Sequence, residues 1–152
     1  TTENKSMNYP ERLRLGDILV QQNLITPTQL QFALAEQLKQ KQSGRRLGRV
    51  LVEQRLVSED QISETLAMQF NIPFINLKHY NVNVETSRRL SEIYARRFRS
   101  VVLNERDGKL LIGMVDPTDT SAIAKISLIL KDEIELAVVT EGQMLEIFGQ
   151  VY

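Results

Sequence analysis

Arg14-Leu15-Gly16 is the stretch around which this sequence is organised, because it returns as Arg46-Leu47-Gly48 with a whole module attached. Residues 14–37 align with residues 46–69 without a gap, at an offset of 32, and 11 of the 24 aligned pairs are identical. A repeat of this length usually means one supersecondary unit used twice. Two copies can form a pseudo-symmetric pair, and such a pair suits a ligand that is itself two-fold.

Each copy has the pattern of a short helix followed by a longer one. Apolar residues at helical spacing predict a short helix over residues 15–22, and Asn23 is suited to end it because asparagine tolerates the left-handed conformation. Thr26-Pro27-Thr28-Gln29 is a capping-box sequence, which predicts a longer helix from there to about residue 40. The second copy repeats this pattern over residues 47–54 and from Ser58 onward, after a loop at 40–45.

The pattern changes after Phe70 from helical repeats to mixed strands and helices. It predicts a strand at 73–77 and then one amphipathic helix at 84–98, which Glu85/Arg89 and Glu92/Arg96 pairs would stabilise. A hairpin of strands 101–104 and 109–115 follows, and residues 116–119 begin another helix. The last predicted elements are a strand at 134–139 and a final helix capped by Thr140. We therefore expect an α+β fold: a flexible leader (1–11), a tandem helical-repeat subdomain (12–71), and a small α/β subdomain with a short sheet (72–152). The final helix has no stop signal, so we expect a longer parent protein.

The bulk composition excludes several classes of protein. The 152 residues suffice for a hydrophobic core, and 42% of them are hydrophobic and 25% charged, as in ordinary globular proteins. The net charge is zero, so no overall field favours a nucleic acid polymer or an anionic membrane. The absence of cysteine excludes disulfides and thiolate metal sites. No apolar run approaches the length of a membrane span, about 18 residues. A cytoplasmic protein is the simplest interpretation.

Each longer helix has a strip that combines apolar groups with one amide. The strips have i, i+4, i+7 spacing and consist of Leu30, Leu34 and Gln37 in the first copy and Ile62, Leu66 and Gln69 in the second. An amide can both donate to and accept from a base edge. The arginine at the start of each short helix, beside free backbone N–H groups, favours an anion. Five basic residues and no acidic one lie between Gln37 and Val52, so the local field is positive.

Two interpretations of these strips stay open at this point. Leucines at i and i+4 usually belong to a core, and a duplicated helical hairpin can serve only to pack against its twin. Packing explains why leucines recur at equivalent positions. It does not readily explain why Arg14/Arg46 and Gln37/Gln69 recur as well, and this repetition of polar residues favours a ligand site.

The tandem pattern RLGxxLVxxxL[IV]xxxx[LI]xxxLxxQ resembles the paired 24-residue motifs of the MshEN domain, the N-terminal regulatory region of bacterial type II secretion and type IV pilus assembly ATPases. Residues 113–119 resemble the part that follows these motifs. The resemblance implies binding of cyclic di-GMP, half of the ligand to each motif. The implied contacts are Arg14, Leu15, Gly16, Leu19, Leu24, Leu30, Leu34 and Gln37, then Arg46, Leu47, Gly48, Leu51, Leu56, Ile62, Leu66 and Gln69, with Arg12 and Asp116 as additional candidates.

This chain departs from the family pattern in three places. The family often has glycine where this chain has Asn23 and Arg55, and Ile62 replaces a leucine. Asparagine can take over the conformational role of glycine, whereas arginine does so less easily. By the resemblance, the second half-site is therefore the one that the departures affect most.

The resemblance also implies partners outside this sequence. A C-terminal ATPase motor, a hexameric parent and inner-membrane pilus or secretion platform proteins are expected, which would place the protein peripherally at the inner membrane. An alternative function is that of a docking adaptor, which links the motor to an inner-membrane partner. No G-x-x-x-x-G-K-[ST] sequence is present, so we expect no ATP hydrolysis by this chain.

The remaining ionisable residues that stand out in the sequence are expected to have structural roles. His79 is the only histidine, so it has no histidine partner for a metal or catalytic pair, and we expect it on the surface. Asp116 is placed to cap a helix. Five arginines, which could bind phosphate or a partner, are interleaved with acidic residues as on a solvated helix face: Arg88, Arg89, Arg96, Arg97 and Arg99. We expect no metal.

Overall fold

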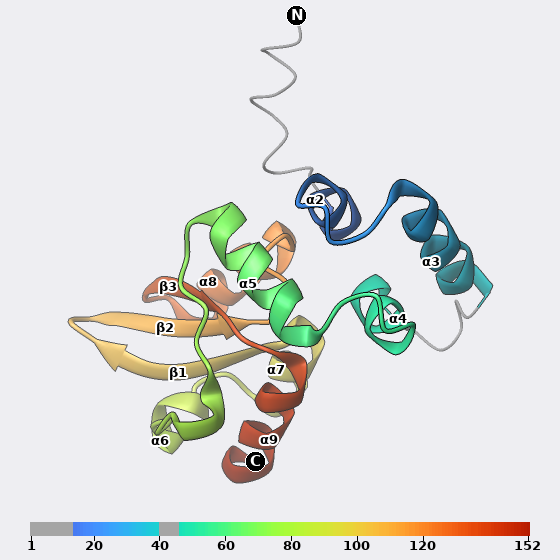
Figure 1. The fold of residues 1–152 in the computed structure, drawn as a ribbon. Coiled ribbons are helices and arrows are strands. Elements are labelled where there is room, and N and C mark those ends of the chain that lie inside the picture. The colour runs from blue at the N-terminus through green and yellow to red at the C-terminus, as the bar shows by residue number, and fades with distance from the viewer. Residues whose placement is uncertain (1–13, 40–45) are drawn as a thin grey trace, which may run out of the picture.

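The computed structural model describes residues 14–39 and 46–152 (Figure 1). The expected leader, the loop between the repeats and Arg12 lie outside the described residues. Within the described part, helices and a three-stranded sheet form the α+β fold that the sequence predicts. We use "repeat module" for α2 to α5 and "α/β module" for residues 72–152.

The repeat module consists of the two helix pairs that the sequence pattern predicts. The first copy forms α2 (Leu15–Gln21) and α3 (Pro27–Lys39), and the second forms α4 (Leu47–Glu53) and α5 (Glu59–Phe70). Both longer helices begin with a reciprocal capping box. In the first, Gln29 N donates to Thr26 Oγ1 at 3.1 Å and Thr26 N donates to Gln29 Oε1 at 2.9 Å. These caps satisfy backbone donors at the helix start, and this explains where each longer helix begins.

The link between the short and long helix has the same backbone in both copies. Asn23 has a φ of 61° and Arg55 a φ of 62°. The following residue closes the same turn in each copy, since Leu24 N donates to Leu19 O at 3.0 Å and Leu56 N donates to Leu51 O at 3.1 Å. Arginine thus takes the left-handed conformation as asparagine does, at a cost of about 1 kcal/mol. The departure at residue 55 leaves the backbone of the second copy unchanged.

The two copies interlock reciprocally. The short helix of each copy packs mainly against the long helix of the other, α2 against α5 and α4 against α3. The two glycines lie at the crossing. A Cβ atom on Gly16 would lie 3.2 Å from Leu47 Cδ2, and one on Gly48 would lie 3.3 Å from Leu15 Cδ2. Each glycine is therefore approached by the leucine of the opposite copy, and Gly16 is approached still more closely by Leu30 of its own copy, at 2.6 Å.

A hydrophobic core holds these four helices together. Its buried members come from both copies: Leu19, Ile25, Leu30, Ala33, Val50, Leu51 and Val57. Leu24 and Leu56, half-buried, occupy equivalent positions against it. Burial of this apolar surface supplies the main driving force for the pairing of the copies.

The α/β module is built on a sheet with the strand order β1-β2-β3. Its elements are the 3-10 helix η2 (Leu77–His79), α6 (Val84–Ser87), α7 (Glu92–Phe98), β1 (Ser100–Arg106), β2 (Lys109–Met114), α8 (Thr120–Leu130), β3 (Glu133–Val138) and α9 (Glu141–Val151). β1 and β2 form an antiparallel hairpin around Asp107-Gly108, both at positive φ, as a tight two-residue turn requires. β2 and β3 are parallel, so their C-terminal ends meet at one edge. His79 is exposed.

Two predicted elements of the α/β module are wrong in extent. The strand expected at 73–77 is only a single bridge to β3. In this bridge Val138 N donates to Pro73 O and Ile75 N donates to Val138 O, and the chain then enters η2. The helix expected at 84–98 is two helices, because Ser91 caps a new helix through Tyr94 N. The Glu92–Arg96 pair forms at 2.9 Å, but Arg89 pairs with Asp132 at 2.7 Å, not with Glu85.

Helix α5 joins the two modules. Figure 1 shows it lying over the sheet while α2, α3 and α4 extend to one side, and it packs on β3. The joint is a small buried cluster of Ile18 from α2, Leu66 and Ala67 from α5, and Val138 from β3. The equivalent of Ile18 in the second copy, Val50, packs inside the repeat core instead. The pseudo-symmetry of the repeats therefore ends where the second copy contacts the sheet.

We expect Ser58→Ala to lower the free energy of unfolding by about 1 kcal/mol, because it removes the hydroxyl that accepts from Gln61 N at 3.0 Å. Urea denaturation followed by circular dichroism measures this. Ser121→Ala is the matched control, since Ser121 is an exposed serine in the first turn of α8. Equal stability of the two variants would contradict the role of this cap.

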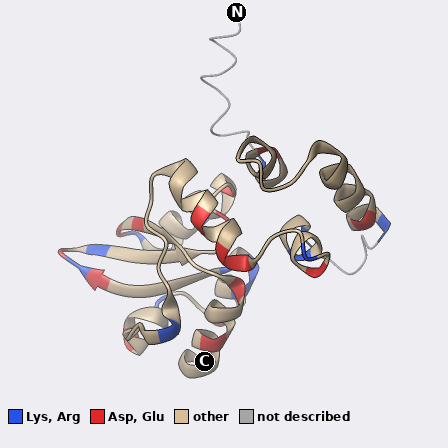
Figure 2. Cartoon of the chain, viewed as in Figure 1, with Lys and Arg blue, Asp and Glu red and all other residues tan. Residues whose placement is uncertain are grey.

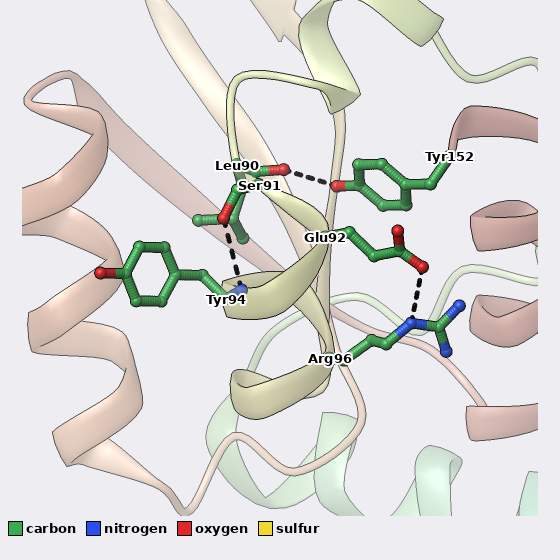
Figure 3. Close-up of polar contacts among 6 residues, drawn as sticks. All are labelled: Leu90, Ser91, Glu92, Tyr94, Arg96 and Tyr152. Atoms are coloured by element: carbon green, nitrogen blue, oxygen red, sulfur yellow. Dashed lines mark hydrogen bonds and ion pairs between the residues drawn. The ribbon is translucent and has the colours of Figure 1, made fainter.

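The aromatic ring of Tyr152 anchors the end of α9 to the α6–α7 connection. Its hydroxyl donates to Leu90 O, beside the Glu92–Arg96 ion pair (Figure 3). Burial above all, and then the negative charge of Glu92, raise the pKa of Tyr152, while Arg96 opposes them. The folded state therefore favours the neutral phenol.

This raised pKa predicts a pH-dependent contribution to stability. A group whose pKa is raised on folding stabilises fully below its unfolded value, about pH 10, and that contribution is lost as the pH rises through the folded value. We expect the stability difference between the unsubstituted chain and Tyr152→Phe to be constant up to about pH 9 and to shrink above pH 10. Denaturation at several pH values measures it, and a difference that grows with pH would contradict the assignment.

Candidate ligand-binding site

A cavity of about 760 Å³ lies between the repeat module and the α/β module. Residues of α2, α3, α4 and α5 line one side, and the other is formed by segments next to the sheet. Its volume falls within the range of small-molecule sites, about 300–1,000 Å³. The cavity is thus large enough for an extended small ligand and is shared by both modules.

Equivalent positions of the two copies meet in this cavity. The sequence-predicted residues that line it form pairs at the repeat offset, Arg14 with Arg46, Leu15 with Leu47 and Leu34 with Leu66, together with Gln37, Gly48, Ile62 and Asp116. Arg14 and Arg46 are the N-cap residues of α2 and α4, and both are exposed. Twin arginines and twin leucines therefore face one space, as a two-fold arrangement requires.

Other sequence-predicted residues lie away from the cavity wall. Leu19 and Leu51 are fully buried in the repeat core, where Leu30 is 9% exposed. Gly16 is buried against Leu30 and Leu47. Leu24 and Leu56 pack on the same core, and Gln69 is exposed to solvent. These positions support the cavity from behind or lie beside it, and their contact with a ligand stays a prediction.

The α/β module contributes the loops that follow its parallel strands. Val115, Asp116, Thr118 and Asp119 come after β2, and Thr140 and Glu141 come after β3. Asp116 accepts a hydrogen bond from Thr118 N at 2.9 Å and another from the Thr118 hydroxyl. The helix cap expected of Asp116 is provided by Asp119, which accepts from Ala122 N at 3.0 Å. Asp116 therefore lines the cavity with its carboxylate held by a neighbouring turn.

Arg99, which the sequence analysis expects on a solvated helix face, instead lines the cavity. It ends α7 in the left-handed conformation, with a φ of 48°, and its side chain is 17% exposed. Its Nη2 atom lies 2.9 Å from Glu141 Oε1. Burial above all, and then the positive charge of Arg46, lower the pKa of Arg99, against the opposing effect of Glu141. Arginine nevertheless stays charged at neutral pH, so a poorly solvated cation faces the cavity.

The other four arginines of this group serve structural contacts. Arg88 Nε donates to Val151 O at 2.9 Å, and Arg89 binds Asp132. Arg96 lies over the Phe148 ring and Arg97 over the Tyr94 ring. No signal in the sequence separates Arg99 from these neighbours, because only the fold turns it toward the repeats.

The chemistry of the cavity suits an anionic ligand with flat apolar faces. Four arginines line it, Arg14, Arg46, Arg49 and Arg99, next to leucine side chains from both copies. Guanidinium groups bind phosphate in a planar, bidentate manner, and leucines offer apolar surface to a base. Carboxylates, among them Asp116 and Glu141, also line it. Figure 2 shows that basic and acidic positions are interspersed over the described residues.

The described part of the chain holds neither a metal-binding group nor a membrane-spanning helix. No group of three or more histidine or acidic side chains there is arranged to hold a metal ion. No described helix combines the length and apolar character that crossing a bilayer takes.

Comparison with known proteins agrees with this geometry. A solved structure of MshE with cdg, which is cyclic di-GMP, superposes with a TM-score of 0.74 at 34% identity and covers 92% of this chain and 99% of that one. The N-terminal domain of XpsE has the same fold, with a TM-score of 0.74 at 24% identity over 93% of this chain and 96% of that one.

Sequence comparison gives the same relationship. The type IV pilus assembly ATPase PilB of Myxococcus xanthus (strain DK1622) is 30% identical over 139 residues, 91% of this chain. The chain spans only 24% of the length of that protein. The family model for the MshEN domain matches residues 70–152, which is more than half of the chain and consists mainly of the α/β module, whereas the resemblance seen in the sequence rests on the repeats. The chain belongs to the MshEN domain family.

Proposed function

We propose that this chain is a regulatory domain that binds cyclic di-GMP, with each of its two 24-residue motifs holding half of one ligand. The observation that carries the proposal is the convergence of Arg14 with Arg46 and of Leu15 with Leu47 on one cavity. A ligand with two chemically identical halves matches such a pair. The similarity to MshE, whose structure was solved with cyclic di-GMP, supports the same ligand class.

In the proposed complex, apolar side chains contribute affinity and polar side chains determine specificity. The guanine faces lie against leucines such as Leu34 and Leu66, and burial of this apolar surface contributes about 25 cal/mol per Å². Arginines bind the phosphates, and Gln37 reads a base edge. Specificity comes from these polar groups, because a buried partner left unpaired costs about 1–3 kcal/mol.

The proposed parent protein is a type II secretion or type IV pilus assembly ATPase. The relationship to PilB supports this. In this proposal the chain regulates a C-terminal motor, and the parent is a hexameric, cytoplasmic protein that contacts inner-membrane platform proteins. The signal is a change in packing between the repeat module and the α/β module when the ligand fills the cavity between them. Hydrogen exchange with and without ligand tests this, since protection confined to residues 14–70 would contradict it.

Titration calorimetry tests the binding itself. We expect one cyclic di-GMP per chain, and much weaker binding of cyclic di-AMP and of GTP. Cyclic di-AMP keeps the two-fold ring and changes the base, whereas GTP keeps the base and lacks the second half. Equal affinity for all three, or two ligands per chain in separate sites, would contradict a shared two-fold site.

A further inference from the structure

Glu141 connects the repeat module to the α/β module through two arginines. Its Oε1 atom lies 2.9 Å from Arg99 Nη2, and its Oε2 atom lies 3.7 Å from Arg49 Nη2. Arg49 belongs to α4 of the second repeat, and Arg99 ends α7 of the α/β module. All three residues line the cavity. One carboxylate therefore bridges two cations that come from opposite sides of the candidate site.

This carboxylate lies against two of the four arginines that line the cavity. Its side chain is 27% exposed, and that of Arg99 is 17% exposed, so the closer of the two pairs is partly withdrawn from water. Arg46 adds positive charge next to Arg99, whose pKa is lowered by burial and by this neighbour. Glu141 is the carboxylate that forms the ion pair with Arg99, and Asp116 adds a second negative charge nearby.

We propose that Glu141 is an internal competitor for the ligand: it pairs with Arg99 and Arg49, and a phosphate of the entering nucleotide has to displace it from these two arginines. This inference rests on the proposed function, because it concerns the anionic part of the same ligand. Displacement breaks the contact between Glu141, at the start of α9, and Arg49 of α4. Ligand binding then changes the contacts between the repeat module and the α/β module.

The test is cyclic di-GMP titration of Glu141→Gln. Glutamine keeps the size of the side chain and its place at the start of α9, which Thr140 still caps, but it removes the negative charge. We expect binding to become roughly twofold to fivefold tighter, the range expected for loss of a competing, partly exposed ion pair. Glu133→Gln is the matched control, because it removes the same charge from an exposed residue whose partner is Lys109, outside the cavity lining, and we expect unchanged affinity.

A second variant separates competition from a general loosening of the site. In an Arg99→Gln background only the longer contact of Glu141 with Arg49 remains, so Glu141→Gln should tighten binding much less than it does in the unsubstituted chain. A gain of undiminished size in this background, or unchanged or weaker binding by Glu141→Gln alone, would overturn the inference and leave the proposed function standing. No binding by the unsubstituted chain would overturn both.

Discussion

Arg14→Ala is expected to weaken binding of cyclic di-GMP roughly hundredfold, and Arg46→Ala to a similar extent. Each substitution removes a charged donor from the cavity, and hydrogen bonds to charged groups contribute about 1.5–3 kcal/mol. Arg14 and Arg46 are exposed, so the melting temperature should stay nearly unchanged. Calorimetry together with thermal unfolding measures both effects.

Arg106→Ala is the matched control for charge, because Arg106 is an exposed arginine at the end of β1. It should leave the affinity unchanged. Retention of full affinity by both Arg14→Ala and Arg46→Ala would refute the site, whereas a large effect of only one would refute equal half-sites.

The glutamines allow a sharper comparison between the half-sites. Gln37 lines the cavity, while Gln69, its equivalent in the second copy, is exposed and lies outside the lining. We expect Gln37→Ala to weaken binding severely and Gln69→Ala to weaken it less. Equal losses would mean that α5 presents Gln69 to the ligand as the repeat pattern predicts.

Leu51→Ala is expected to lower the free energy of unfolding by about 2–5 kcal/mol, because Leu51 is fully buried in the core shared by the two copies. This is a large part of the stability of a domain, about 5–15 kcal/mol. Its equivalent Leu19, also fully buried, should give a loss of similar size. Urea denaturation measures both.

Leu38→Ala provides the control, since Leu38 is 72% exposed near the end of α3. Its effect on stability should stay within about 0.5 kcal/mol. If Leu51→Ala were as stable as Leu38→Ala and only lost ligand affinity, Leu51 would be a ligand contact and not a core residue.

Local features of the fold could be predicted from the sequence because they depend on neighbouring residues. The capping boxes at Thr26 and Ser58 and the left-handed Asn23 lie where the residue types place them. The predictions of local structure fail where contacts between residues far apart in the sequence determine the structure. Residues 73–77 pair with β3 only at one bridge, and Arg89 prefers Asp132, which is 43 residues away, to the helical neighbour Glu85.

For the site, the repeats predicted only the wall that carries the duplicated motif. Arg99, Glu141 and the loops after β2 and β3 form the other wall, and these have no recurring pattern that would mark them. Helical spacing also could not separate Leu34, which lines the cavity, from Leu30, which faces the core, since both belong to the same strip. That division depends on where the opposite copy packs.

The crossing of the two copies has a consequence for how such a chain could arise. Because α2 is completed by α5 and α4 by α3, neither copy encloses a core of its own. A gene that encoded one copy alone would need two molecules of its product to build this arrangement, as a homodimer. In the single chain the two halves are covalently joined, so each half can differ from the other, and Ile18 and Val50, at equivalent positions, pack in different clusters.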